Sequence, residues 1–323
     1  MPAPGLPTAP GPPKRPACRN RIKLLALLAP HRLGTMTTLI DFARLPWPQG
    51  TIKHAVFDID GTLTDAHSLT SEATIDALRR LDAAGVPITL ATGRLLHGGA
   101  NLVRRAGIHA WVIAAGGGVV WNGKDIVAAH YMDADYVEAI TALAIRLRLV
   151  PFYFDEEEVY TDRAAMAETG MLRINENAGE GKPMLDLAHF NIARATKVSL
   201  AAATGEEIDA VLDQVVAAFP ETVRSHANFL DISAPGVTKW EGIERALAVR
   251  GLRPEDGLGV GDSDNDVAWL TRIGLPVAAP IASPAVLATC RFALPQVNDA
   301  VAQLIDAELA RPHSLGADDV QLD

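Results

Sequence analysis

The sequence has few of the features that mark secreted, membrane-spanning or nucleic-acid-binding proteins. Its only cysteines, Cys18 and Cys290, are far apart and not spaced as metal ligands, which argues against a disulfide framework and fits a reducing compartment. No apolar run approaches the roughly 18–20 residues that a membrane-spanning helix needs. Lys and Arg total 29 against 39 Asp and Glu, and the net charge of −10 disfavours nonspecific nucleic-acid binding. We therefore predict a cytoplasmic protein that binds neither nucleic acid nor membrane.

Aromatic residues are also scarce, at 5%, so the core must consist mainly of Ala, Val, Leu and Ile. The remaining composition, 49% hydrophobic and 21% charged, is that of an ordinary globular protein. A chain of 323 residues has room for one large or two ordinary domains. Composition leaves the oligomeric state open.

The N-terminal residues 1–35 are rich in proline and carry several basic but no acidic residues. We interpret them as a disordered tail, or as an extension upstream of a start at Met36, with a targeting peptide as the alternative. Residues 1–49 are accordingly assigned to an N-terminal extension and are left out of the fold argument.

From Lys53 onward, short apolar strands alternate with amphipathic helices, except in a middle part of different texture. Such alternation predicts βαβ units and a parallel sheet covered on both faces. The predicted fold is α/β, a Rossmann-like parallel sheet core with an inserted α+β cap domain. The predicted core spans residues 50–126 and 230–310, the cap 127–229, and the C-terminal tail 311–323.

The first candidate site is Asp58-Ile59-Asp60-Gly61-Thr62, where the predicted strand His54–Ile59 ends. Residues i and i+2 of a strand point to the same face, so both carboxylates can reach one site. Adjacent carboxylates repel one another unless a cation lies between them. This pattern suits phosphoryl transfer onto an aspartate, although Asp-Gly is also common in simple turns.

Two further segments offer groups that bind phosphate. Thr92-Gly93-Arg94 follows the predicted strand Val86–Ala91, where a hydroxyl and backbone N–H groups form a natural cradle and Arg94 adds a fork for an anion. A helix N-cap explains Thr92 equally well. Lys239 begins a predicted helix, where a positive charge opposes the helix dipole, so it either holds a phosphate or the charge of the nucleophile, or is simply solvated.

The fourth segment, Gly261-Asp262-Ser263-Asp264-Asn265-Asp266, follows the predicted strand Gly257–Val260. Its acidic and amide side chains suit a hard cation with oxygen ligands, while Ser263 or Asp264 is expected to cap the next helix. The spacing differs from that of a twelve-residue calcium loop, which excludes that alternative.

Taken together and in this order, the four segments resemble the haloacid dehalogenase-like hydrolase superfamily, and in particular its Cof-type, class IIB sugar-phosphatase-like branch, over residues 52–307. The resemblance implies that Asp58 is the nucleophile and that Asp60 is the acid/base. It also implies a Mg²⁺ cofactor held by Asp58, the Asp60 carbonyl and Asp262, with Asp266 orienting that shell. The implied phosphate ligands are Thr92, Gly93, Arg94, Lys239 and Asn265.

The implied function is that of a Mg²⁺-dependent phosphatase, which hydrolyses a small phosphate monoester such as a sugar phosphate through an aspartyl-phosphate. A phosphohexose mutase and a noncatalytic sugar-phosphate sensor are the alternatives. The chain departs from its relatives' usual Asn-Gly at Ala115-Gly116-Gly117-Gly118, from their usual Gly at Trp240, and at Ala279–Ala282. None of these positions is catalytic, but they concern the substrate pocket. The cap offers these candidate specificity residues: Arg163, Lys182, His189, Arg194, Arg224, His226 and Asn228.

Overall fold

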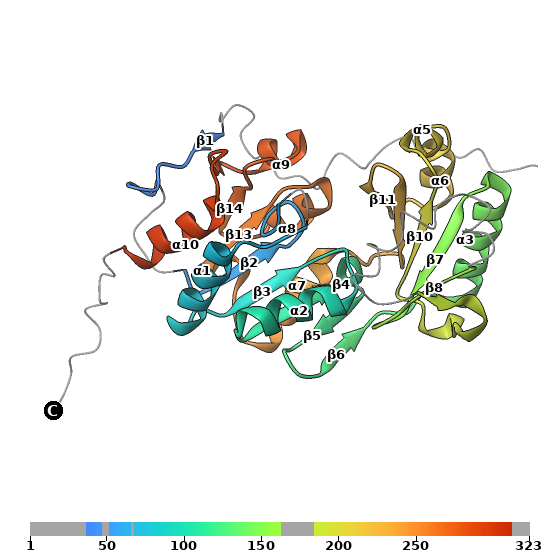
Figure 1. The fold of residues 1–323 in the computed structure, drawn as a ribbon, viewed down its shortest axis with the longest axis horizontal. Helices are drawn as coiled ribbons and strands as arrows, with labels where there is room; N and C mark the ends of the chain where they lie inside the picture. Colours follow the sequence, from blue (N-terminus) through green and yellow to red (C-terminus); the bar gives the residue numbers. More distant parts are fainter. Residues whose placement is uncertain (1–36, 47–51, 66–67, 163–183, 312–323) are drawn as a thin grey trace, which may run out of the picture. The chain divides into compact units, whose positions relative to one another are not determined.

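The structure, a computed structural model, describes residues 37–46, 52–65, 68–162 and 184–311 (Figure 1). The predictions for residues 1–35 and for Arg163 and Lys182 lie outside these ranges. All the described residues belong to one compact unit, which contains both of the sheets described below.

The larger sheet joins nine strands of the described residues in the order β1-β15-β14-β13-β2-β3-β4-β5-β6. Neighbours from β1 to β4 pair in parallel, and the pairs β4–β5 and β5–β6 are antiparallel. The strands are β1 (Thr38–Leu39), β2 (His54–Asp58), β3 (Ile88–Ala91), β4 (Ala110–Ala114), β5 (Val119–Trp121), β6 (Ile126–Ala129), β13 (Gly257–Gly261), β14 (Leu275–Ala278) and β15 (Phe292–Ala293).

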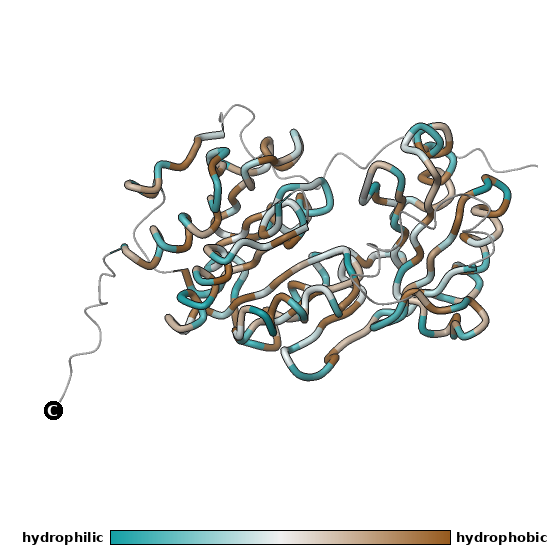
Figure 2. The backbone as a smooth tube through the Cα atoms, in the orientation of Figure 1, coloured by the Kyte–Doolittle hydropathy of each residue, from teal (hydrophilic) through white to brown (hydrophobic). Residues whose placement is uncertain are grey.

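Helices cover both faces of this sheet, which is why its central strands are apolar almost throughout (Figures 1 and 2). In β2, Ala55 and Phe57 pack with α1 (Glu72–Ala83), α2 (Leu96–Ala106) and α10 (Ala300–Leu309). Val56, which points the opposite way, packs with α7 (Lys239–Val249), α8 (Val267–Leu270) and α9 (Pro284–Thr289). The predicted α/β fold class is confirmed.

Local sequence signals explain where several helices begin. The Ser71 side chain accepts a hydrogen bond from the Thr74 N–H and starts α1. Thr238 starts α7 with a capping box, in which Glu241 reciprocates the hydrogen bond. A second capping box, between Ser263 and Asp266, starts the 3₁₀ turn η6 (Asp264–Asp266) that leads into α8, so Ser263 is the cap expected there. Further 3₁₀ turns are η1 (Ala115–Gly117), η3 (Leu187–His189), η4 (Ile192–Arg194) and η5 (Pro254–Asp256).

The smaller sheet joins six strands of the described residues in the order β11-β12-β10-β7-β8-β9, antiparallel except for β8–β9. One face packs against α3 (Ala134–Leu147), α5 (Gly205–Asp209) and α6 (Leu212–Ala218). The strands are β7 (Val150–Phe154), β8 (Val159–Thr161), β9 (Leu185–Asp186), β10 (Lys197–Ala201), β11 (Thr222–His226) and β12 (Phe229–Ser233). This sheet is the α+β insertion, whose predicted boundaries stay a prediction.

Helix α2 and strand β1 are among the elements that differ from the sequence-based expectation. The apolar spacing predicts a helix only over Asn101–Ala106, but helix α2 begins at Leu96, because the glycines at its start hide the apolar periodicity. Thr38–Leu39, placed by the sequence in the N-terminal extension, forms the edge strand β1 beside β15. A two-residue strand carries too few side chains to show any periodicity.

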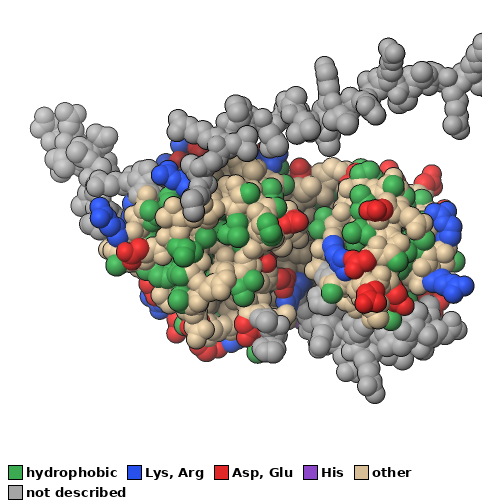
Figure 3. Space-filling view, turned by 90° about the horizontal axis from the view of Figure 1, so that it is seen from above, with side chains coloured by type: hydrophobic (Ala, Val, Ile, Leu, Met, Phe, Trp, Pro, Cys, Tyr) green, Lys and Arg blue, Asp and Glu red, His purple; other side chains and the backbone are tan. Residues whose placement is uncertain are grey.

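No helix in the described part of the chain is long and apolar enough to cross a bilayer. On the face shown in Figure 3, Lys and Arg side chains lie in separate groups, without forming a continuous basic patch. The charge of −10 is therefore not offset by a concentrated positive surface on that face.

The buried histidine at the start of β2, His54, makes the fold sensitive to acid. Its Nε2–H donates to the Arg253 carbonyl at 2.9 Å, while Nδ1 has no hydrogen-bond partner within the described residues. Burial lowers the pKa of His54, outweighing the opposing effect of the Arg253 hydrogen bond. The unfolded chain therefore takes up a proton more readily than the native protein does, and stability falls as the pH drops through about 6.5.

We expect wild type to lose more unfolding free energy between pH 7.5 and pH 5.5 than His54→Gln, which cannot titrate in that range. Urea denaturation of both proteins at the two pH values measures this difference. An equal loss in both would show that His54 is not the titrating group.

Candidate active site

Three of the four chemically interesting segments lie at the ends of neighbouring parallel strands. The central order β13-β2-β3 places Asp262, Asp58 and Thr92 at the carboxyl-terminal edge of the sheet. In open α/β sheets, this edge forms the ligand crevice. Lys239, at the first position of α7, is buried at the same edge.

Asp58 and Lys239 form a buried ion pair although 181 positions separate them in the sequence. The lysine Nζ lies 2.5 Å from Asp58 Oδ1 and 2.7 Å from Asp266 Oδ1, and all three side chains are at most 3% exposed. Burial alone would lower the pKa of Lys239, but the negative charges of Asp266 and Asp58 have a larger effect and raise this pKa. The lysine therefore carries its charge in the folded protein.

Asp266 has every hydrogen-bonding position occupied. Its Oδ1 accepts from Lys239 and from the Trp269 indole N–H at 2.9 Å, and its Oδ2 accepts from the backbone N–H groups of Asp262 and Ser263 at 3.1 Å. Although burial alone would raise it, the Lys239 charge and these hydrogen bonds lower the pKa of Asp266. Asp266 is thus an ionised carboxylate that orients both Lys239 and the loop of Asp262.

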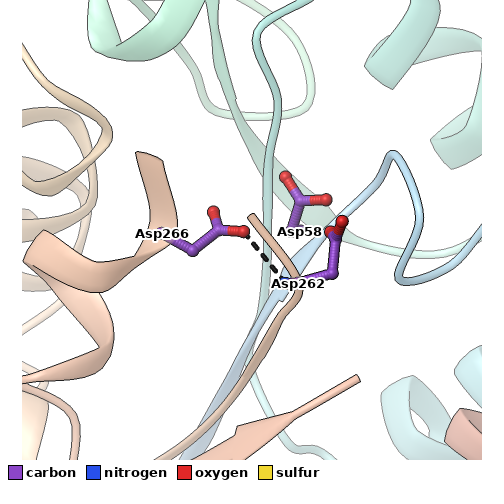
Figure 4. Close-up of side chains that lie close together, drawn as sticks. All are labelled: Asp58, Asp262 and Asp266. Carbon is purple, nitrogen blue, oxygen red and sulfur yellow. Dashed lines mark hydrogen bonds between the residues drawn. The ribbon is translucent and has the colours of Figure 1, made fainter. Parts of the chain in front are cut away.

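Asp262 lies against the turn that follows β2. The Thr62 hydroxyl donates to Asp262 Oδ1 at 3.1 Å, and a Cβ on Gly61 would lie 2.6 Å from Asp262 Oδ2. Gly61 also has φ +81°, so both its missing side chain and its backbone conformation are required here. Burial, reinforced by the charge of Asp266, raises the pKa of Asp262 to about 6. Figure 4 shows the carboxylates of Asp58 and Asp262 beside each other.

The acidic cluster has the charge and the donors that a divalent cation requires. One oxygen each from Asp58, Asp262 and Asp266 lies within 4.8 Å of the others, and Lys239 is the ammonium bonded to two of these carboxylates. With all three carboxylates ionised, as metal binding requires, three negative charges and one ammonium give a net charge of −2. Burial raises the pKa of Asp58 well above its ordinary value, against the opposing effect of Lys239. A bound cation would remove that penalty.

The surroundings of Asp58 Oδ2 indicate that a cation fits this site. This atom is buried and has no hydrogen-bond partner among the described residues, which is costly for a carboxylate oxygen. The atoms of this cluster that could bind a metal ion are all carboxylate oxygens, the ligand type that Mg²⁺ prefers. The residues present therefore fit a Mg²⁺ ion.

Asp60 belongs to a second group of contacts at the same edge. Its Oδ2 accepts from the Thr92 hydroxyl at 3.1 Å, and its Oδ1 accepts from the Arg94 guanidinium, with Nε at 2.6 Å. Arg94, expected to bind a substrate anion, is thus paired with the side chain of Asp60. Asp60 remains 43% exposed, so solvent and ligands can reach it.

The glycine run after β4 lets α7 approach the sheet closely. A Cβ on Gly117 would lie 1.9 Å from the Thr238 carbonyl oxygen, immediately before Lys239. Ala115, the first residue of this run, has φ +50°, a conformation that asparagine tolerates better than alanine.

The remaining sequence-predicted residues are less central. Asn265 lies in η6, and its Oδ1 accepts from the Ser263 hydroxyl at 2.8 Å. In the cap, Arg194 pairs with Glu156, Arg224 pairs with Asp209, and the Asn228 amide donates to the Ala202 carbonyl. His189 ends η3. His226 ends β11, and its side chain lies outside what the structure describes.

Sequence reasoning missed Lys197 and Asp231, a nearly buried ion pair of the cap sheet that reaches the core loop after β3. A lysine at the start of an apolar strand is a weak signal, because such positions are usually solvated. Its partner lies on a different strand, β12, and the pairing depends on the register between β10 and β12.

The profile of one protein family, described as haloacid dehalogenase-like hydrolase, matches residues 55–305. The chain is 25% identical over 257 residues to the putative phosphatase YxeH of Bacillus subtilis, covering 74% of this chain and 92% of that protein. It is also 25% identical over 229 residues to a phosphoglycolate phosphatase of Methanothermobacter thermautotrophicus, covering 70% of this chain and 85% of that protein.

Solved structures show the same fold. A haloacid dehalogenase-like hydrolase from Bacteroides thetaiotaomicron superposes with a TM-score of 0.68 at 21% identity, covering 79% of this chain and 99% of that one. A structure described as the subclass IIB sugar phosphatase BT4131 gives a TM-score of 0.65 at 22% identity, covering 79% and 98%.

Proposed function

The chain belongs to the haloacid dehalogenase-like hydrolases, and on that basis we propose that it is a Mg²⁺-dependent phosphatase acting through an aspartyl-phosphate on Asp58. The observation that carries the proposal is the meeting of Asp58, Lys239 and Asp262 at the carboxyl ends of neighbouring strands. A fixed ammonium and a bound cation beside a buried carboxylate offset the repulsion between the carboxylate and the negative phosphoryl oxygens. The carboxylate can therefore attack phosphorus.

In the first step, a carboxylate oxygen of Asp58 attacks phosphorus, and the bond from phosphorus to the leaving alcohol oxygen breaks. Protonated Asp60 gives its proton to that oxygen, so the alcohol leaves neutral. Lys239 and the backbone N–H of Gly93 hold the phosphoryl oxygens. The Thr92 hydroxyl, whose proton is donated to Asp60 Oδ2, orients the turn instead.

In the second step, Asp60 takes a proton from a water molecule, and the water oxygen attacks the phosphorus of the aspartyl-phosphate. The bond between phosphorus and Asp58 breaks, which restores the carboxylate and releases inorganic phosphate. Asp60 is then protonated again and ready for the next cycle, as its 43% exposure to solvent and ligands permits.

Mg²⁺ would be held by Asp58, Asp262 and the backbone carbonyl of Asp60, and when bound it would neutralise charge on the phosphoryl group. Asp266, whose oxygens are already occupied by Lys239, Trp269 and two backbone N–H groups, would orient the ligands without binding the ion itself.

The substrate we propose is a small phosphate monoester, such as a sugar phosphate. Support comes from the inserted α+β cap, since a cap over the crevice excludes water and selects small molecules. The likeness to a subclass IIB sugar phosphatase agrees with this choice.

We expect the purified protein to release phosphate from p-nitrophenyl phosphate and from members of a sugar and polyol phosphate panel. Removing the metal with EDTA should lower the rate by about 10²-fold or more, and added Mg²⁺ should restore it. Mg²⁺ should also raise the thermal unfolding midpoint, because it binds only the folded acidic cluster. Folded, Mg²⁺-loaded protein that releases no phosphate from any ester would contradict the proposal. Turnover of a phosphoprotein alone would contradict the substrate class.

A further inference from the structure

Lys197 is a charged side chain of the cap sheet held almost entirely away from water. It is 4% exposed and opens strand β10. Its ammonium is 2.9 Å from Asp231 Oδ2 and lies 4.2 Å above the centre of the Phe154 ring. Burying an ammonium is costly unless it is paired and fully hydrogen-bonded, so its remaining partner is informative.

That partner belongs to the core. Lys197 Nζ donates to the backbone carbonyl of Gly93 at 2.8 Å, in the turn that follows β3. A Cβ on Gly93 would make an ordinary contact, 3.9 Å, with Asp231 Oδ2, so this turn lies directly beside the ion pair. The cap thus reaches the turn Thr92-Gly93-Arg94 through a charge-assisted hydrogen bond.

The Gly93 carbonyl shares its planar peptide group with the N–H of Arg94. This N–H donates to the Thr92 hydroxyl at 3.0 Å, and the same hydroxyl donates to Asp60 Oδ2 at 3.1 Å. A chain of hydrogen bonds therefore runs from Lys197 through the peptide group and the Thr92 hydroxyl to Asp60, and each group donates toward Asp60. Hydrogen bonds aligned in this manner polarise and strengthen one another.

An apolar contact holds the same turn from its other end. Leu95, the residue before α2, is 3% exposed and packs with Val150, Phe152 and Ala201 of the cap sheet. Cap side chains contact the turn at both Gly93 and Leu95. These contacts constrain the backbone between the two residues when the cap packs against the core.

We propose that Lys197 is a positioning residue for the acid/base Asp60, acting through the Gly93–Arg94 peptide and the Thr92 hydroxyl. The inference rests on the proposed function, since it assumes that Asp60 protonates the leaving alcohol. Lys197 does not touch the reacting atoms. Its hydrogen bond fixes the peptide plane, which fixes the Thr92 hydroxyl that points at Asp60. The general acid is therefore fully aligned only when the cap contributes its lysine.

This role predicts that the effect of losing Lys197 depends on the leaving group. An alkyl alcohol leaves poorly as an anion and needs the proton of Asp60, whereas p-nitrophenolate leaves without one. Lys197→Met should lower kcat/KM for an alkyl phosphate by at least about tenfold more than for p-nitrophenyl phosphate. This loss is only part of the rate gain that a general acid supplies, because Asp60 itself is still present. kcat/KM is the parameter to compare, because it includes the step in which the alcohol leaves.

The experiment compares four variants on both substrates, with thermal unfolding as a check on folding. Asp60→Asn should show the full leaving-group dependence, and Lys197→Arg, which can still donate to Gly93 and Asp231, should regain most of the alkyl phosphate activity. Ser199→Ala is the matched control. Ser199 lies on β10, like Lys197, and the substitution removes its buried 2.6 Å hydrogen bond to Asp231 of β12. It should affect both substrates equally.

The outcomes distinguish a failure of the positioning role of Lys197 from a failure of the acid/base role of Asp60. Equal losses on both substrates in Lys197→Met, with the dependence present in Asp60→Asn, would overturn the positioning role and leave the proposed function intact. No dependence in Asp60→Asn would overturn the acid/base assignment and the inference with it. If Lys197→Met does not fold, Lys197→Gln, which stays polar but is too short to keep both bonds, provides the same comparison.

Discussion

Asp58→Asn lowers phosphate release by about 10⁴-fold or more, the largest loss that we expect from any single substitution in the chain. An amide oxygen is a poor nucleophile and forms no stable acyl phosphate, so the first chemical step has no route. The side chain keeps its shape, and Asn can still accept a hydrogen bond from Lys239. Steady-state phosphate release measures the loss, and acid quenching of the enzyme with labelled substrate measures the covalent intermediate.

The matched control is Asp125→Asn, an exposed aspartate in the turn between β5 and β6, which should keep wild-type activity. Labelled protein should be recovered from wild type but not from Asp58→Asn. Activity of Asp58→Asn within about tenfold of wild type would rule out Asp58 as the nucleophile.

Lys239→Met should be the most destabilising substitution of a polar residue at the site. Lys239 is 3% exposed and is the ammonium that pairs with both Asp58 and Asp266. Its removal leaves buried carboxylates without a positive partner, a change that costs about 3–5 kcal/mol of unfolding free energy. Phosphatase activity should be lost as well, because a ligand of the phosphoryl group disappears. Urea denaturation in the absence of Mg²⁺ measures the stability change.

Lys53→Met provides the comparison, since Lys53 also pairs with an aspartate, Asp256, but its side chain is 65% exposed. Exposed pairs contribute at most about 1 kcal/mol, so this variant should remain close to wild type. If the two lysine variants were equally stable, the buried ion pair would not support the site as described.

The sequence predicted the positions of the chemistry better than the contacts among them. Asp58, Thr92 and Asp262 each follow an apolar strand, and parallel strands end at one edge of a sheet. The gathering of these three positions could therefore be expected from the order of strands and helices alone. The capping role expected for Ser263 could also be predicted, because a cap depends on residues within one turn.

Contacts between distant segments could not be predicted in this way. The sequence did not predict that the Arg94 guanidinium pairs with Asp60, and binding of a substrate anion by Arg94 stays a prediction. Arg194 and Arg224 were candidate specificity residues, but each pairs with an acidic side chain of the cap. A long cationic side chain reaches any acid within several ångströms, and which acid lies there is set by how the strands and loops pack.

By itself, the sequence determined the alternation of strands and helices, the inserted middle segment and the acidic residues at strand ends, because these follow from local periodicity and turn chemistry. Only the tertiary structure decided between the roles open to Lys239, by bonding it to both Asp58 and Asp266, and showed that Lys197 of the cap sheet donates to Gly93 of the core. Both lysines are buried, and a buried charge is stable only where folding places its partners around it. Local sequence carries no record of those partners, since Lys239 meets Asp58 only when α7 packs on the larger sheet, and Lys197 meets Gly93 only when the two sheets pack together.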